Sequence, residues 1–591
     1  MVAVVYDSIR KFRKRLRIRG TDEMHAVADY LKPCRWRIVR VVSLQFAAAV
    51  LELLLPLLLA HIIDVSVPAR NLCSVWGTGA VMVLCSGAVG WGNVTANRKA
   101  TKIATDVTQT LRRDLFSKIS GLSCAQADRY ASASLVSRLT NDTYNVYELF
   151  DKLQRGGTRA PLMVIGGLFL TFALEPWLAL IQFAASGLTL LAVWAVTARG
   201  VPYYTQAQSA VDTMVRMVRE NAGGVRVIKA TAREEDEQAR FSTANGEVRR
   251  TQQRAGQIMA LTNPATSFLL NVGLTAVVGA GAFLVNSGAM PVGQIVAFLS
   301  YFTIILNAAI GLTKVFTRLS KGIASARRIG EILELPAEQP VEPEKTPCPP
   351  GLGMERVSFS YLGAENNLLD ASFSLQRGET LGIMGPTGSG KTTLVSLLLR
   401  LYDADSGLVW VDGWNIRAQL PETLRSRLGV VLQNDILLSG SVYENISCLR
   451  SLTPEQVAQA VETAQAAEFI DTLDGGYDHP VEIRGNNFSG GQRQRLLIAR
   501  ALAGSPEILV LDNADSALDY RTAAALYAAI RRDFPELTVI LISERASSLR
   551  AADRILVLED GQITHQGTHA ELFESCPRYR AMVQLQMGDT V

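Results

Sequence analysis

Six apolar segments in the first half of the chain constrain its fold more than any other feature. A helix that crosses the hydrocarbon core of a bilayer needs about 20 mostly apolar residues. Candidate segments are Val39–Ile63, Trp76–Thr95, Pro161–Leu174, Trp177–Thr197, Ile258–Val285 and Gln294–Val315. The third is short and can begin a few residues earlier. The charged share of 19% lies below the usual value of about 25%. We therefore expect an all-α transmembrane domain with six helices over residues 36–330.

Lysine and arginine are unevenly divided between the segments that connect these spans, and this bias sets the orientation. Arg70 is the sole basic residue in three short connections, Asp64–Val75, Glu175–Pro176 and Asn286–Val292. The N-terminal segment and the stretches Lys99–Arg159 and Arg199–Arg254 are basic. The basic side is therefore predicted to be cytoplasmic. We expect both long stretches to extend the spans as helices into the cytoplasm, in a multi-pass protein of a bacterial inner membrane.

The N-terminal segment 1–35 carries a dense basic run, with seven Lys or Arg residues between Arg10 and Arg19. We expect it to be cytoplasmic and to lie on the anionic inner leaflet. Nucleic-acid binding is the weaker alternative, since the net charge is only +4. The N-terminus lacks the pattern of a cleavable signal peptide. The seven cysteines form no CxxC pair, so neither a structural zinc site nor a disulfide framework is expected.

The composition changes after the last span. Residues 331–350 are rich in proline and glutamate, which is typical of a linker. From residue 351 to 591, apolar runs alternate with helical stretches, which predicts an α/β domain with a largely parallel sheet. The runs expected to be strands are Thr380–Met384, Leu428–Leu432, Ile508–Leu511 and Val539–Ile542.

A phosphate-binding loop directly follows the first of these strands. It reads Gly385, Pro386, Thr387, Gly388, Ser389, Gly390, Lys391, Thr392 and is followed by Thr393. Glycines let backbone N–H groups surround phosphate oxygens, and the N-terminus of the next helix favours negative charge. Lys391 can contact the β- and γ-phosphates, and the Thr392 hydroxyl can ligate Mg²⁺. Asp512 ends a later strand and can also hold the metal, so ATP and Mg²⁺ are the expected ligands.

Several further motifs resemble those of exporter-type ATP-binding cassette (ABC) transporters. Asn487–Arg500 is similar to their signature region, and Ser516–Asp519 is similar to their D-loop. Gln433 resembles their Q-loop glutamine, and Tyr361 the aromatic residue that stacks on adenine. In the membrane half, Ser137–Asp142 and Glu220–Ala230 resemble cytoplasmic loops of the family.

The resemblance implies a half-transporter with an α/β P-loop nucleotide-binding domain. Two such halves pair, and each ATP lies between the phosphate loop of one and the signature motif of the other. Ser489, Gly490, Gly491, Gln492 and Asp519 would then complete the partner's nucleotide site. Gln433 would contribute to the metal and the hydrolytic step.

Two positions depart from the family at the residues that carry hydrolysis. Asn513 stands where the family places a glutamate that polarises the attacking water, and a neutral amide cannot accept a proton. Glu544 stands where a histidine contacts the γ-phosphate. Asp515 replaces the usual threonine, and Ile483 is a smaller departure before the signature. We expect this site to bind Mg-ATP and hydrolyse it poorly; the alternative is that Glu544 itself serves as the base.

An intact signature beside an impaired base predicts a second, non-identical half-transporter as partner. The expected function is export of a small amphipathic molecule, as in multidrug efflux, with no role for nucleic acid. Two alternatives stay open: an importer of a siderophore-like compound on the exporter fold, and a regulatory subunit that never hydrolyses ATP.

Polar residues within the spans are candidates for substrate contact. Glu52 lies in the middle of the first span and would favour cationic cargo, or it bonds a neighbouring helix. His61 and Asp64 lie near the outer end. Asn263, Asn271 and Asn307 either contact substrate or link helices.

Overall fold

In the computed structural model, the described residues are 27, 29–336, 348–361, 363 and 366–587. The basic run before Val27 and most of the linker lie outside them. The chain divides into two compact units, Met1–Ile119 with Ala133–Leu335 and Ser120–Ser132 with Pro336–Val591. The short segment 120–132 therefore groups with the nucleotide-binding domain, which the sequence did not indicate.

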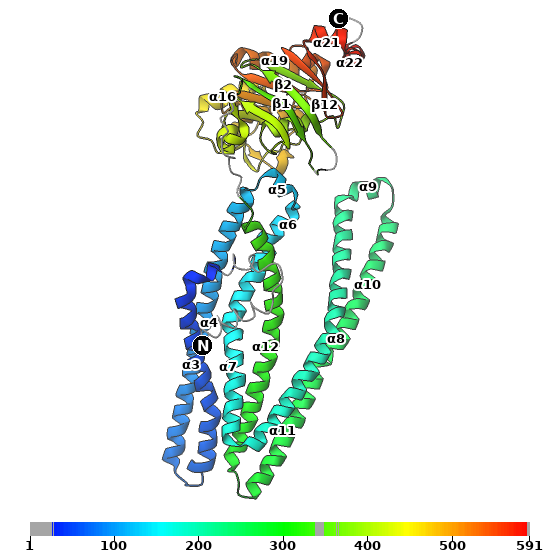
Figure 1. Cartoon of the computed structure of the whole chain (residues 1–591). Coiled ribbons are helices and arrows are strands. Elements are labelled where there is room, and N and C mark those ends of the chain that lie inside the picture. Colours follow the sequence, from blue (N-terminus) through cyan, green and yellow to red (C-terminus); the bar gives the residue numbers. More distant parts are fainter. Residues whose placement is uncertain (1–26, 28, 337–347, 362, 364–365, 588–591) are drawn as a thin grey trace. The chain divides into compact units, whose positions relative to one another are not determined.

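All the regular elements in the described part of the first unit are helices (Figure 1). Its elements are η1 (Asp29–Cys34), α3 (Arg35–His61), η2 (Ile62–Ser66), α4 (Leu72–Ser120), α6 (Ser132–Ser137), η3 (Arg138–Asp142), α7 (Thr143–Leu174), α8 (Pro176–Gly223), α9 (Val225–Ala230), α10 (Glu234–Ala260), α11 (Thr262–Asn286) and α12 (Val292–Leu333). Six helical stretches are long and apolar enough to cross a membrane, which confirms the predicted spans.

Several of these helices are too long for a bilayer alone. Helix α4 has 49 residues and α8 has 48, so each is about 70 Å long, against a hydrocarbon core of about 30 Å. The prediction that the spans continue as helices into the cytoplasm is therefore confirmed. Helices α8 and α10 run side by side and are joined by the short α9 (Figure 1).

The third predicted span is part of a longer helix than its apolar residues indicate. Helix α7 begins at Thr143, so Pro161 lies in its interior. Charged and polar residues on the first half of α7 hid this continuity from a search for apolar stretches. The predicted turn after this helix is correct: Glu175 is extended, and Pro176 opens α8 at its first turn, where a missing N–H costs nothing.

Small residues let α3, α7 and α12 pack closely. A Cβ at Gly166 would lie 2.5 Å from Leu53 on α3, and one at Gly167 would lie 2.7 Å from Ile305 on α12. The hydroxyl of Tyr301 donates a hydrogen bond of 2.6 Å to the carbonyl of Leu53. Close backbone approach of this kind is the usual basis of helix association in membranes.

Glu52 bonds a neighbouring helix, which was the second of its two predicted roles. Both of its carboxylate oxygens accept hydrogen bonds from Nη2 of Arg159 on α7, at 2.8 and 2.7 Å. The Glu52 side chain is 24% exposed and that of Arg159 is 42% exposed. The charge of Glu52 is thus balanced within the bundle. At the outer end, Asp64 accepts a hydrogen bond from the backbone of Gly293 at the start of α12.

Of the other candidates for substrate contact, Asn263, Asn271 and Asn307 are exposed on the single chain. Their predicted contact with substrate or with another helix stays a prediction.

The second unit contains two main sheets. One has six strands in the order β12-β11-β3-β10-β9-β6 and the other has four in the order β2-β1-β4-β5. The strands are β1 (Leu352–Phe359), β2 (Leu368–Leu375), β3 (Thr380–Met384), β4 (Ser406–Val411), β5 (Trp414–Asn415), β6 (Leu428–Val431), β7 (Gly440–Ser441), β8 (Pro480–Val481), β9 (Ile508–Asp512), β10 (Thr538–Ile542), β11 (Arg554–Glu559) and β12 (Gln562–Gly567).

Strands β6, β9, β10, β3 and β11 are parallel neighbours, and β12 is antiparallel at one edge. The four runs predicted as strands are β3, β6, β9 and β10. Strands β9 and β10 are buried along their whole length, which explains their unbroken apolar sequence.

The helices of this unit are α5 (Cys124–Asp128), α13 (Lys391–Leu398), α14 (Pro421–Ser426), α15 (Val442–Ser447), α16 (Pro454–Thr463), α17 (Ala467–Asp471), α18 (Gly490–Leu502), α19 (Tyr520–Asp533), α20 (Ala546–Leu549), α21 (His569–Ser575) and α22 (Pro577–Met587). The fold is thus a six-helix transmembrane domain followed by an α/β P-loop domain, as predicted.

The Glu52–Arg159 pair generates a stability prediction. Glu52→Gln and Arg159→Gln should each lower the thermal unfolding midpoint, because each leaves one charge without its partner. The double variant should recover part of the loss. We expect an interaction energy of about 1 kcal/mol from the double-mutant cycle, since Arg159 is partly exposed. Arg70→Gln, in an outer loop, is the control, and strictly additive losses would contradict the pairing.

Candidate functional site

The phosphate-binding loop joins the carboxyl end of β3 to the start of α13. Gly388 and Gly390 have φ angles of 85° and 99°, a region that side chains with a Cβ rarely adopt. A Cβ at Gly390 would also lie 2.7 Å from the carbonyl oxygen of Asn367. The hydroxyl of Ser389 is buried and has no hydrogen-bond partner among the described residues. These features fit a loop whose polar groups are completed by phosphate.

The side chain of Lys391 folds back onto the first residues of this loop. Its ammonium group donates hydrogen bonds of 2.8 Å to the carbonyl oxygens of Gly385 and Pro386. Burial lowers the pKa of Lys391, while the carboxylates of Glu544 and Asp512 act in the opposite direction. The ammonium therefore has two acidic side chains in its electrostatic neighbourhood.

Asp512 is the last residue of β9 and is only 1% exposed. Its Oδ2 accepts a hydrogen bond of 3.0 Å from the hydroxyl of Thr392 at the start of α13. Burial raises the pKa of Asp512, and the Thr392 bond and the charge of Lys391 oppose that shift. A hydroxyl and a carboxylate at this separation are oxygen ligands of the kind that Mg²⁺ prefers.

Asn513 directly follows β9, beside the end of the neighbouring strand β10. It has a φ of 53°, in the left-handed region that asparagine tolerates better than most residues. Its backbone N–H donates a hydrogen bond of 3.0 Å to the carbonyl of Ile542, the last residue of β10. A neutral amide thus follows the buried Asp512 at the end of the strand.

Glu544 follows β10 two residues later and is exposed. Its backbone carbonyl accepts a hydrogen bond of 2.8 Å from the Gln586 side chain on α22. Lys391 lies within the electrostatic influence of its carboxylate. The structure therefore brings Lys391, Asp512 and Glu544 to the same edge of the sheet, at the carboxyl ends of β3, β9 and β10.

Asp515 has a structural role that the sequence did not reveal. It is 1% exposed, and its Oδ2 accepts hydrogen bonds from the hydroxyls of Ser543 at 2.7 Å and Ser548 at 2.5 Å. The Ser543 hydroxyl in turn accepts from the backbone N–H of Arg545. Asp515 thus anchors both sides of the turn that presents Glu544. The sequence signal for this role was the pair of hydroxyl side chains at Ser543 and Ser548, on either side of Glu544. Both can donate hydrogen bonds to a carboxylate such as Asp515.

The signature residues form a helix start. The Ser489 hydroxyl accepts a hydrogen bond of 3.3 Å from the backbone N–H of Gln492, and the Gln492 side chain accepts one of 2.9 Å from that of Ser489. This capping box fixes the first turn of α18. Ser489 and Gly490 are exposed, and within the described part of the chain no hydrogen bond joins them to the phosphate loop. They are free to contact a nucleotide held elsewhere.

Asp519 caps α19. Its carboxylate accepts bonds of 2.9 and 2.7 Å from the backbone and hydroxyl of Thr522, and these bonds lower its pKa. Its predicted contact with nucleotide stays a prediction. Gln433 is exposed just beyond β6, and Ile483 is exposed before the signature; the roles suggested for them also stay predictions.

Tyr361 belongs to a cluster of three aromatic rings. Its ring lies edge-on to Phe359, with centroids 4.9 Å apart, and to Tyr402, with centroids 5.0 Å apart. The backbone N–H of Tyr361 donates a hydrogen bond of 3.1 Å to the side chain of Asn367, whose carbonyl lies against Gly390. The predicted adenine-stacking residue is thereby tied to the phosphate loop.

Tyr402 also connects this cluster to α5. Its hydroxyl donates a hydrogen bond to the carboxylate of Asp128 at the end of that helix. Burial raises the pKa of Tyr402, as do the bond to Asp128 and its charge. A short helix between the membrane helices α4 and α7 therefore contacts the ring that supports Tyr361. Nothing in the sequence separation of 274 residues indicated this contact.

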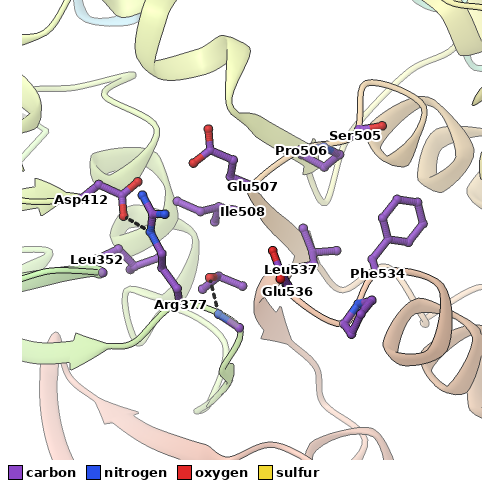
Figure 2. Close-up of a pocket in the computed structure, with 14 residues that line it drawn as sticks. Leu352, Arg377, Asp412, Ser505, Pro506, Glu507, Ile508, Phe534, Glu536 and Leu537 are labelled. Carbon is purple, nitrogen blue, oxygen red and sulfur yellow. Dashed lines mark hydrogen bonds and ion pairs between the residues drawn. The ribbon is translucent and has the colours of Figure 1, made fainter.

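A cavity of about 790 Å³ lies at the opposite edge of the sheet, and Figure 2 shows its lining. It includes the first residues of β9 and β10, Ile508 and Thr538. Arg377 donates a hydrogen bond of 2.7 Å to Asp412 in its wall. Because the strands have five residues, this cavity is about 17 Å from the carboxyl ends. It shares no residue with the candidate nucleotide site.

Comparisons with known proteins find relatives of both parts of the chain. The family model for the ABC transporter transmembrane region matches residues 38–309, and the ABC transporter model matches residues 368–516. An uncharacterized ABC transporter ATP-binding protein of Mycobacterium tuberculosis is 33% identical over 561 residues, covering 93% of this chain and 96% of the relative.

A fatty acid ABC transporter ATP-binding/permease protein of Mycobacterium tuberculosis is 34% identical over 464 residues, which cover 78% of this chain and 74% of that protein. Among solved structures, a bacterial Atm1-family ABC exporter with ATP bound matches with a TM-score of 0.79. The match covers 94% of this chain and 99% of that chain at 23% identity. At that identity the likeness shows the fold.

The aromatic cluster predicts that Tyr402 has two separable effects. Tyr402→Ala removes the ring that packs against Tyr361, so ATP affinity should fall about two- to tenfold. Tyr402→Phe keeps the ring and loses only the bond to Asp128, so affinity should stay within about twofold. Titration with a fluorescent ATP analogue measures both. Equal losses in the two variants would show that the ring contact does not support nucleotide binding.

Proposed function

The chain belongs to the ABC transporter family as an exporter-type half-transporter, and we propose that it is the degenerate-site subunit of a heterodimeric exporter. It has one six-helix transmembrane domain and one cytoplasmic ATP-binding domain. On this proposal its own phosphate loop binds Mg-ATP and turns it over slowly. Its signature motif completes the hydrolytic site of a different half-transporter.

The observation that carries the proposal is the amide of Asn513 next to Asp512. A general base contributes about 10²–10⁴-fold to such a reaction. Asn513 continues directly from the buried Asp512, and its backbone is fixed to Ile542. No proton acceptor is present on that side chain.

Glu544 adds a second obstacle to hydrolysis. Its carboxylate lies in the electrostatic neighbourhood of Lys391, the residue expected to contact the β- and γ-phosphates. A negative side chain there opposes the negative charge of the transferred phosphoryl group, where a preorganised donor would stabilise it. The hydrogen bonds from Ser543 and Ser548 to Asp515 hold the turn that carries Glu544.

Binding of the nucleotide is supported by the groups that are retained. Lys391, Thr392 and the glycines of the loop would hold the phosphates, and Thr392 with Asp512 would hold Mg²⁺, joined by Gln433 as in the family. Tyr361 would stack on adenine. The capping box of Ser489 and Gln492 keeps the first turn of α18 in order. On this proposal the chain therefore retains the signature residues that would contact the nucleotide of its partner.

The proposed cargo is a small amphipathic molecule exported across a bacterial inner membrane. One bacterial relative is a fatty acid ABC transporter, and fatty acids are amphipathic. Glu52 is neutralised by Arg159, so it gives no reason to prefer a cation. The proposed partners are a second, non-identical half-transporter, the transported molecule and the lipid bilayer.

Restoring the two hydrolytic residues should raise the ATPase rate of the purified chain. Asn513→Glu supplies a base, and Glu544→His removes the negative charge and supplies a phosphate donor. Together they should increase phosphate release at least about tenfold. The same variant carrying Lys391→Ala is the control and should lose the gain. An unchanged rate would count against the degenerate site.

Glu544→Gln separates this proposal from the alternative in which Glu544 is the base. A neutral amide removes the repulsion, so phosphate release should rise or stay the same on the present proposal. A fall of about a hundredfold would assign the base to Glu544.

A further inference from the structure

A basic cavity lies between the cytoplasmic start of α3 and the middle of α4. The two helices approach closely at Gly92, where a Cβ would lie 3.4 Å from that of Ala48. Nearer the cytoplasm a space of about 400 Å³ opens between them. Its lining residues are Arg37, Arg40, Lys99, Lys102, Ile103 and Asp106, and we call this the α3–α4 groove.

The charges in the α3–α4 groove do not balance. Four of its six lining residues are cations and one is a carboxylate. Arg37 forms an ion pair of 3.2 Å with Asp106. Among the described residues, no carboxylate pairs with Arg40, Lys99 or Lys102. Within the described part of the chain, three positive charges therefore line one cavity with no carboxylate paired to them, which favours an anionic ligand.

The α3–α4 groove lies at the level of the inner-leaflet headgroups. Arg40 is at the beginning of the first apolar span, and Lys99 and Lys102 follow the end of the second at Thr95. Four to seven residues of helix correspond to about 6–10 Å. The interfacial region extends about 5–8 Å beyond the hydrocarbon core on each side, so Lys99 falls within it and Lys102 at its cytoplasmic border. Trp36, one residue from Arg37, is 69% exposed, as is typical of interfacial aromatic residues.

An exposed aromatic side chain lies on the membrane side of the groove. Trp91 on α4 is 68% exposed and directly precedes Gly92, where α3 and α4 meet. A ligand with phosphate in the groove and acyl chains along the apolar part of α4 would match both the charge and the apolar surface. Inorganic phosphate would interact with the cations of the groove and not with the apolar surface.

We propose that the α3–α4 groove binds the phosphate of an anionic phospholipid from the cytoplasmic leaflet. Arg40, Lys99 and Lys102 are the groups that contact the phosphate, and Ile103 forms the buried floor. Basic pockets between membrane helices on the cytoplasmic side are suited to such headgroups. The lipid would bridge α3 and α4 below their contact at Gly92. The inference is independent of the nucleotide site and its partner.

The test measures phosphatidylglycerol bound to the purified full-length chain by native mass spectrometry, with phosphatidylcholine as the neutral comparison. Arg40→Gln with Lys99→Gln should weaken phosphatidylglycerol binding about tenfold or more. The matched control is Arg35→Gln with Arg98→Gln, which removes two exposed cations from the same helices but outside the groove. It should keep most of the binding.

A photo-crosslinking phosphatidylglycerol on the unmodified chain covers the case in which the double variant does not fold. Labelling within residues 37–48 and 92–106 supports the proposal, and labelling confined to other helices overturns it. Equal loss in the matched control, equal binding of phosphatidylcholine, or full displacement by inorganic phosphate each overturn it as well. The last result would mean a site for free phosphate.

Discussion

The hydrogen bond between Thr392 and Asp512 is the contact on which the nucleotide site depends. It joins the helix after the phosphate loop to the last residue of β9, and both groups are oxygen ligands suited to Mg²⁺. Because β9 lies between β10 and β6, fixing its end also fixes Asn513 and, through Ile542, the turn that carries Glu544. On the proposal made here, the chain keeps the framework that holds a nucleotide and lacks the side chains that would cleave it.

The changed residues form a consistent set. Asn513 has no proton acceptor, Glu544 places negative charge near Lys391, and Asp515 anchors the turn of Glu544 through two serine hydroxyls. Because the buried carboxylate of Asp515 accepts two hydrogen bonds, it is satisfied and holds that turn in place. Together with the intact first turn of the signature helix α18, these residues support the proposal that this subunit binds ATP and a different subunit hydrolyses it.

Much of this was predictable from the sequence, for physical reasons that differ between the parts. The spans follow from their apolar length, and the phosphate loop follows from a glycine pattern between a strand and a helix. A bond from Glu52 to a neighbouring helix was one of its two predicted roles, but its partner Arg159 was not predicted, because the polar first half of α7 lay outside the apolar segment. The bonds of Asp515 to Ser543 and of Tyr402 to Asp128 join residues distant in the chain, and no local pattern encodes such contacts. The α3–α4 groove, the proposed lipid site, likewise depends on two helices that meet at Gly92.

The central claim is that this chain holds ATP while its partner cleaves it. The direct measurement is to photo-crosslink an azido-ATP during turnover to the complex isolated from its own cells, then identify the nucleotide attached to each subunit. The account predicts mainly triphosphate on this chain and mainly diphosphate on the partner. Diphosphate in equal proportion on both subunits would contradict it.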